Sequence, residues 1–413
     1  EGVGRVRFDL VGGAGGAATS FTPQYLTDVT NAALSGGGAG AQLSGVLAVK
    51  SGDILRVWAG NGGVGSAAGA QPALGGEGYA AGGDSTGSSK ATGSAQVVGT
   101  DSGYVYGASG GGSSAVELVR DGAVTIVAVA GAGGGGAQLG TLTTHQGVFD
   151  TQPKDQLNPA LRVAPDGRDA STTAGGSAGG DLGTDNTGQG GMLMASPYQE
   201  FKPLDEDDKT LDMRFMVTGG TAGRSGVAGT LGEALVGVLD ENNELKLMPM
   251  SDPWFETYDF PRYYMYEGDS VVEGEKGTGG ADATGSYRGK GGSGALLSRT
   301  HGKLSLTSVA SGGGAGYGGG GAGLNIWTIG AYRESVFGRQ VQFENEGNIY
   351  SLSSLSSGGG AGGSYINHEV VSDFALATAK NANPTAGVRS PGSAALYSCT
   401  ENATLNTPIT EGA

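Results

Sequence analysis

Residues 124–136 read VTIVAVAGAGGGG, and this stretch joins the two kinds of element that recur along the whole chain. Its first half is rich in Val and Ile, as β-strands are. Its second half is a glycine tract that follows the strand with no intervening turn. Because the same order of strand and glycine recurs from end to end, the sequence predicts a mainly β protein with little α-helix.

The amino-terminal segment shows the same combination. Val6, Phe8 and Leu10 alternate with charged residues immediately before a tract at residues 12–16 that contains only glycine and alanine. Alternation of period two is typical of a half-buried strand. We therefore expect a strand here with these three side chains on its buried face.

Two hairpins are predicted in the first half of the chain. Residues 47–58 contain two apolar segments around a Ser-Gly-Asp turn. Residues 116–129 contain two more around Asp121-Gly122, which is a strong signal for a two-residue turn. Sustained 3.6-residue periodicity is absent, and the best candidate for a short helix is residues 370–380.

The second half of the chain repeats this order. Residues 213–220 (MRFMVTGG) resemble residues 6–13 (VRFDLVGG), and later segments at 236–247 and 291–309 resemble the two predicted hairpins. Ordered correspondences of this kind indicate an internal duplication. The predicted units are a glycine-rich β-module at 1–198, a second at 199–398 with an aromatic insertion at 248–275, and a C-terminal tail at 399–413.

Glycine supplies 85 of the 413 residues, whereas ordinary proteins contain roughly 7%. A run such as residues 311–321 has three possible states: disordered, a loop, or an extended helix with three residues per turn. Such a helix makes no hydrogen bond within itself, so neighbouring runs can satisfy one another's backbone groups. Without a Cβ, the backbones also approach closely. Since strands flank nearly every run and anchor it, we expect bundles of polyglycine II helices.

Four segments together resemble a known family: residues 6–16, 44–63, 110–136 and 358–365. They are similar to the glycine-rich domain of the anaplastic lymphoma kinase and leukocyte tyrosine kinase extracellular regions, and to glycine-rich modules of bacterial and phage surface proteins. The resemblance implies two jelly-roll-like β-sandwich modules whose loops extend into polyglycine bundles. In the kinases this domain binds a protein ligand, but no residue of that surface is carried over to this chain.

Composition argues against several classes of function. The formal net charge of −16 disfavours binding to nucleic acid, which requires clustered Lys and Arg. Cys399 is the single cysteine, so no intrachain disulfide framework is expected. No apolar run reaches the roughly 18 residues of a membrane-spanning helix. The chain begins at Glu1 rather than Met, which we interpret as a processed end or a boundary within a longer chain, and we expect a secreted, cell-surface location.

Motifs associated with catalysis are present only in fragments. Residues 131–136 follow a strand and match a dinucleotide-binding glycine pattern, but no helix is predicted after them. Residues 107–111 match the G-x-S-x-G pattern inside a glycine-rich stretch, where such a match means little. His145, His301 and His368 are scattered, and with one cysteine they suggest neither a metal site nor a catalytic triad. We expect no enzyme activity and no cofactor.

Two clusters remain as weaker candidate sites. An acidic cluster is best explained as a solvated turn, although it offers oxygen ligands of the kind that calcium prefers, without the spacing of an EF-hand: Asp205, Asp207 and Asp208. An aromatic cluster is either a packed loop or a contact surface: Trp254, Phe255, Tyr258, Tyr263 and Tyr264. Asn402 also begins a glycosylation sequon.

The C-terminal tail has the pattern of a strand that the first module lacks. Modules of this type open with an extra strand, present in the second module at residues 199–204 and missing before Val6. We predict that the tail of one subunit supplies it to the next by strand addition. The donor residues are Leu405, Thr407 and Ile409, and the acceptor residues are Val6, Phe8 and Leu10. Closure within one chain and a disordered tail are the alternatives.

These observations predict an extracellular structural protein, a subunit that polymerises with itself into a surface filament. The alternative is an adhesin or receptor-binding module of a phage or bacterial surface, whose polyglycine bundle holds a cell-surface or glycan ligand.

Overall fold

The structure is a computed structural model that describes most of the glycine runs and strands. The described ranges are residues 4–17, 36–65, 73–85, 108–136, 142–144, 191–194, 213–224, 226–239, 245–249, 271–273, 278–284, 288–294, 296–301, 304–332, 349–383, 389–399 and 405–408. Within these ranges the protein is mainly β, as predicted, with 19 strands in antiparallel sheets and no helix.

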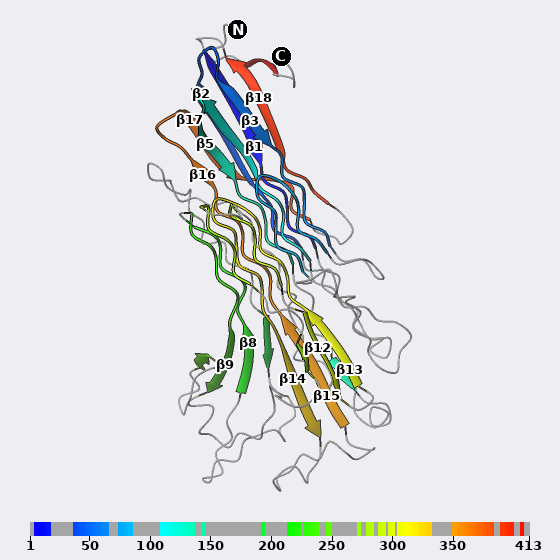
Figure 1. Ribbon diagram of the computed structural model, residues 1–413. Helices are drawn as coiled ribbons and strands as arrows, with labels where there is room; N and C mark the ends of the chain where they lie inside the picture. The colour runs from blue at the N-terminus through cyan, green and yellow to red at the C-terminus, as the bar shows by residue number, and fades with distance from the viewer. Residues whose placement is uncertain are drawn as a thin grey trace.

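Two sheets form one end of the molecule, which we call the terminal end (Figure 1). Sheet A has the order β17 (Val371–Thr378), β2 (Ala41–Ala48), β1 (Arg5–Val11), β18 (Ser393–Cys399), β19 (Leu405–Pro408). Sheet B has the order β16 (Tyr365–Ile366), β5 (Ala123–Ala130), β4 (Ser114–Arg120), β3 (Ile54–Trp58).

Three sheets form the opposite end, which we call the distal end (Figure 1). Sheet C has the order β10 (Leu245–Pro249), β9 (Ala234–Leu239), β8 (Met213–Val217), β7 (Gly191–Met194). Sheet D has the order β11 (Val271–Glu273), β12 (Leu296–His301), β13 (Leu304–Val309). Sheet E has the order β14 (Asn325–Tyr332), β15 (Ile349–Ser356), β6 (Leu142–Thr144).

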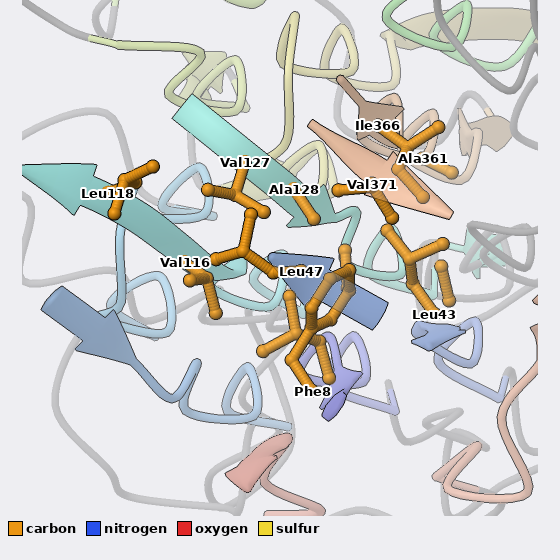
Figure 2. Packing of buried hydrophobic residues seen from close by; sticks show 13 residues of the cluster. Phe8, Leu43, Leu47, Val116, Leu118, Val127, Ala128, Ala361, Ile366 and Val371 are labelled. Atoms are coloured by element: carbon orange, nitrogen blue, oxygen red, sulfur yellow. The ribbon is translucent and has the colours of Figure 1, made fainter. Parts of the chain in front are cut away.

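The core of the terminal end lies between sheets A and B. Val6, Phe8 and Leu10 of β1 are buried and alternate with partly exposed residues, which confirms the predicted period-two strand. Figure 2 shows side chains of this core. The buried cluster contains Phe8, Leu10, Ala41, Leu43, Leu47 and Val371 from sheet A, with Val116, Leu118, Val127, Ala128, Ala130 and Ile366 from sheet B and Ala361 from the glycine run at 357–364.

One predicted hairpin is confirmed and the other is wrong. β4 and β5 pair across Asp121-Gly122, and both turn residues have positive φ (52° and 81°), as this type of tight hairpin turn requires. In contrast, β2 and β3 do not pair, because β2 joins sheet A and β3 joins sheet B. The Ser-Gly-Asp turn therefore crosses from one sheet to the other.

Residues 370–380, the best candidate for a short helix, do not form one. This segment contains β17, which pairs with β2 along the edge of sheet A. Its register shifts between Ser372 and Ala375, where Asp373 has a φ of 50°. A β-bulge of this kind suits an edge strand, and here pairing with β2 outweighs the weak local preference for helix.

The sheets combine strands from both sides of residue 198. β16, β17 and β18 pair in sheets A and B with strands from residues 5–130, and β19 pairs with β18. In the other direction, β6 adds to β15 at the distal end. The chain thus passes from one end of the molecule to the other more than once.

Glycine runs fill the space between the two ends (Figure 1). We call these hydrogen-bonded runs the glycine bundle. Its segments are residues 12–16, 36–40, 60–65, 73–85, 108–113, 131–136, 218–224, 226–232, 278–284, 288–294, 310–324, 357–364, 381–383 and 389–392. Runs from both halves of the sequence are neighbours in it, since Gly83 N–H donates to Gly313 O and Gly135 N–H donates to Gly312 O.

Candidate functional site

The glycine bundle is held together by backbone hydrogen bonds that change partner at every residue. Along residues 312–317, successive N–H groups donate to carbonyls of three different runs. The bonds are Gly312 to Ala108, Gly313 to Gly292, Gly314 to Gly360, Ala315 to Gly111, Gly316 to Gly289 and Tyr317 to Gly363, with N···O distances of 2.8–3.0 Å. Each neighbour therefore returns at every third residue, as expected for an extended helix with three residues per turn.

The run at residues 12–16 has the same period. Gly12 and Gly15 donate to the run that ends at Ala41, while Gly13 and Gly16 donate to residues 112 and 109. Ala14, between them, donates to Ser390 O. A β-strand forms a continuous ladder of hydrogen bonds with one neighbouring strand on each side. A glycine run instead distributes its hydrogen bonds among three neighbouring segments.

Close packing explains why so many positions are glycine. A Cβ added to Gly110 would overlap the carbonyl oxygen of Gly313, and one added to Gly134 would overlap that of Gly359. The atoms in the way are backbone, which has no rotamer to adopt. Alanine does occur in the bundle where its Cβ fits, as at Ala132 and Ala315, both fully buried. The requirement for glycine is therefore specific to position.

Side-chain hydroxyls satisfy backbone groups where runs end. The Ser364 hydroxyl accepts from Gly131 N–H, the Ser357 hydroxyl accepts from Leu324 N–H, and the Ser114 hydroxyl accepts from Gly60 N–H. At these points the hydrogen-bond ladder of a sheet ends and the pattern of the glycine bundle begins. A backbone N–H at the border has no carbonyl partner in either pattern, so the serine hydroxyl satisfies it. The sequence signal for these contacts is a serine at or close to the border of a glycine run, and it is absent from the sequence predictions above.

Two asparagines complete one side of the bundle. Asn381 Nδ2 donates to Gly12 O, and its Oδ1 accepts from Gly40 N–H. Asn383 is fully buried, and its Nδ2 donates to Gly15 O. These side-chain amides make the hydrogen bonds that the backbone of another glycine run makes elsewhere in the bundle.

An aromatic cluster fastens the bundle to the outer face of sheet B. Trp58 meets Tyr79 edge to face at 5.2 Å between ring centroids. Tyr317 stacks on Tyr365 at 4.1 Å. Both pairs pack around Ala115 and Val129 of sheet B. Aromatic pairs in these geometries stabilise by roughly 0.5–1.5 kcal/mol beyond the apolar area that they bury.

A buried carboxylate lies beside this cluster. Glu117 has a side chain only 5% exposed, and Arg56 and Arg288 each place a guanidinium nitrogen 4.0 Å from it. The Arg288 guanidinium also lies 5.7 Å from the centre of the Tyr79 ring. Burial, and next the charge of Glu117, raise the pKa of Tyr79 to about 12. Sequence reasoning missed this cluster, because its members come from segments up to 307 residues apart.

A second ionic contact links two turns at the terminal end. Arg120 donates from Nε and Nη2 to the two carboxylate oxygens of Asp53, at 2.9 and 2.6 Å. Lys50 N–H donates to the same carboxylate. These hydrogen bonds, with that from Arg120 the largest, outweigh partial desolvation and lower the pKa of Asp53 to about 2 from its ordinary value of 3.8. The contact ties the β2–β3 crossing to the β4–β5 turn.

Replacing Asp53 with Asn should destabilise the protein above about pH 4, and this destabilisation should disappear in acid. Because the folded-state pKa is lowered, the contribution is complete above the unfolded-state value near 3.8 and disappears as the pH falls through about 2. Thermal unfolding midpoints of the wild type and Asp53→Asn, measured from pH 2 to 6, should therefore converge as the pH falls. Asp121→Asn is the control, since the Asp121 side chain is 81% exposed and its ion pair with Lys50 lies at the surface. A difference independent of pH would contradict the role given to the Asp53 carboxylate.

The predicted assembly residues are placed as follows. Val6, Phe8 and Leu10 lie in β1, which is paired on both sides, with β2 and with β18. Leu405 and Thr407 lie in β19, which pairs with β18 of the same chain, so β18 separates the predicted donor from the predicted acceptor. Ile409 lies outside the described residues. Donation between chains stays a prediction.

The other predicted sites lie mostly outside the described residues. These are the acidic residues Asp205, Asp207 and Asp208, the aromatic residues Trp254, Phe255, Tyr258, Tyr263 and Tyr264, and also His145 and Asn402. His368 is partly buried, with its ring edge-on to Phe374 at 4.7 Å. Across the described ranges, no group of three His, Cys, Asp or Glu side chains is arranged to hold a metal ion. No helix in those same ranges is long and apolar enough to cross a membrane.

Comparison of the sequence with protein-family models and with curated proteins gives no match.

Proposed function

We propose that this chain is an extracellular structural protein, a subunit of a surface filament in which the C-terminal strand passes from one subunit to the next. The glycine bundle is the observation that carries the proposal, because runs from both halves of the sequence bond to one another between two sets of sheets. A body of this kind is a rod with a sheet-forming region at each end.

The bundle gives this rod its rigidity. The hydrogen bonds of one run go to three different neighbours, as along residues 312–317, so one run cannot slide without breaking bonds to all three. Carbonyl oxygens occupy the space where side chains would otherwise be, as at Gly110 and Gly134. The runs are polyglycine II helices in this proposal, and sheets A and B form a jelly-roll-like sandwich that anchors them.

The C-terminal strand suits transfer between subunits. Among the described strands, β19 is the last strand of sheet A and pairs with the outer end of β18, at Tyr397, Ser398 and Cys399. The core under β1 is already covered by β2, β18 and sheet B, so losing β19 leaves it covered. Strand addition supplies affinity through main-chain hydrogen bonds, which any exposed strand edge offers.

Deletion of residues 400–413 tests this function. The full chain should form filaments visible by negative-stain electron microscopy, and the shortened chain should remain monomeric in light scattering. The shortened chain should still fold, with the same far-ultraviolet circular dichroism and a cooperative thermal transition, because β1 to β18 are intact.

Filaments of the shortened chain would show that the tail is not the link. Monomers of the full chain that bind cells or glycans would favour the adhesin function instead.

A further inference from the structure

Sheets A and C have the same plan at opposite ends of the molecule. β8 and β9 come from the segments that resemble β1 and β2 in sequence, and they pair in the same antiparallel way. In position, β10 lies beside β9 as β17 lies beside β2, and β7 lies beside β8 as β18 lies beside β1. In sequence, β10 belongs to the segment 236–247 that resembles residues 47–58, so its sequence counterpart is β3 of sheet B. All these neighbours are antiparallel, so the four strands of sheet C match four of sheet A in order and direction.

The register supports the same match. Phe8 of β1 and Phe215 of β8 occupy the same place in the repeated sequence. Phe8 lies opposite Leu396 of β18, and Phe215 lies opposite Leu193 of β7. With these two leucines taken as equivalent, Tyr397 of β18 corresponds to Met194 of β7.

Among the described strands, one strand of sheet A has no counterpart in sheet C, and the opening strand predicted at residues 199–204 lies outside the described residues. β19 extends sheet A beyond β18, whereas among the described strands none lies beyond β7. β19 attaches to the end of β18 farthest from the glycine bundle, and sheet C lies at the other end of the molecule (Figure 1). A β19 strand that fills the position beyond β7 must therefore come from a second copy of the chain.

We propose that β19 of one chain adds to β7 in sheet C of the next chain, in the way that it adds to β18 within its own sheet A. This assignment rests on the proposed function and identifies the strand that accepts β19. The acceptor is β7 at the distal end, rather than β1, which contains Val6 and Leu10. The contact joins a terminal end to a distal end, so it is heterologous and does not close on itself. Repetition of the contact therefore builds a filament of rods.

The sequence of β19 is compatible with an outermost strand. It contains Leu405, Asn406, Thr407 and Pro408. Proline has no N–H to donate and is confined to positions such as edge strands. After transfer, sheet C has five strands in the same order as sheet A.

Cysteine cross-linking tests the acceptor directly. Pro408 lies opposite Tyr397 in sheet A, so the equivalence places it opposite Met194 of the next chain. In a Cys399→Ser background, which removes the single native cysteine, we compare the pair M194C and P408C with the pair Y397C and P408C. Directly opposed strand residues lie about 4.5–5.5 Å apart at Cα, within disulfide range. Oxidised filaments are examined by non-reducing electrophoresis.

The expected result is a ladder of covalent multimers from the first pair and little multimer from the second, whose two cysteines lie opposite each other in sheet A of a single chain. Filaments that give a ladder only from Y397C and P408C would overturn the assignment, because β19 would then enter sheet A of the next chain, while the filament function would stand. Filaments that give no ladder from either pair would also overturn it. If the unsubstituted chain forms no filaments at all, the proposed function fails and the acceptor assignment fails with it.

Discussion

Amide protons in the glycine bundle should exchange with solvent about 10⁴-fold more slowly than those of a free peptide, or more slowly still. Gly314 N–H and Ala315 N–H donate to carbonyls in different runs, and both residues are buried. Exposing either amide requires separation of several runs at once, because each run is bonded on three sides. Exchange in the bundle should therefore need nearly global unfolding, and a stability of 5–15 kcal/mol slows it by such factors.

Hydrogen exchange followed by mass spectrometry measures this directly. Peptides covering residues 131–136 and 311–323 should remain protected for hours. The matched control is the exposed turn that contains Gly52, a glycine with a φ of 91°. This turn lies outside the glycine bundle, so its amides lack the protection expected for the bundle. If the two bundle peptides exchange as fast as this turn, the runs are not held by one another and the rod does not exist.

The elements of this fold were largely predictable, whereas their partners were not. The alternation of Val6, Phe8 and Leu10 identified both a strand and its buried face, and Asp121-Gly122 identified a hairpin. A period-two pattern says which face of a strand is buried but not which strand lies beside it. For that reason the alternation in residues 47–58 predicts one hairpin, whereas β2 and β3 belong to different sheets.

Long-range contacts explain the rest of what sequence reasoning missed. Residues 370–380 are the best candidate for a short helix by local pattern, because the strand form of β17 depends on pairing with β2, more than 320 residues earlier in the chain. The ion pairs of Glu117 likewise depend on Arg288, and the buried side-chain amide of Asn383 donates to Gly15 O, far away in the sequence. No local pattern marks such residues. The glycine runs are the opposite case, since their composition predicted close backbone packing and the positions of the carbonyls account for it.

A single methyl group in the bundle should destabilise the protein more than most surface substitutions. Gly110→Ala places a Cβ on the carbonyl oxygen of Gly313, where two halves of the sequence meet. Neither backbone can move aside without breaking hydrogen bonds, because Gly110 N–H donates to Gly83 O and Gly313 N–H donates to Gly292 O. Overpacking a rigid interior typically costs 1–3 kcal/mol and sometimes more, so we expect a loss of about 3 kcal/mol in the free energy of unfolding.

Gly4→Ala is the matched control, because a Cβ added at Gly4 meets no atom within 4 Å. At a compatible site this substitution stabilises by about 0.4–1 kcal/mol, since it restricts the unfolded chain. The two substitutions add the same methyl group, so they should move the denaturant midpoint of unfolding in opposite directions. Equal midpoints for the two variants would mean that the carbonyl of Gly313 does not lie against Gly110, and that close packing is not what requires glycine there.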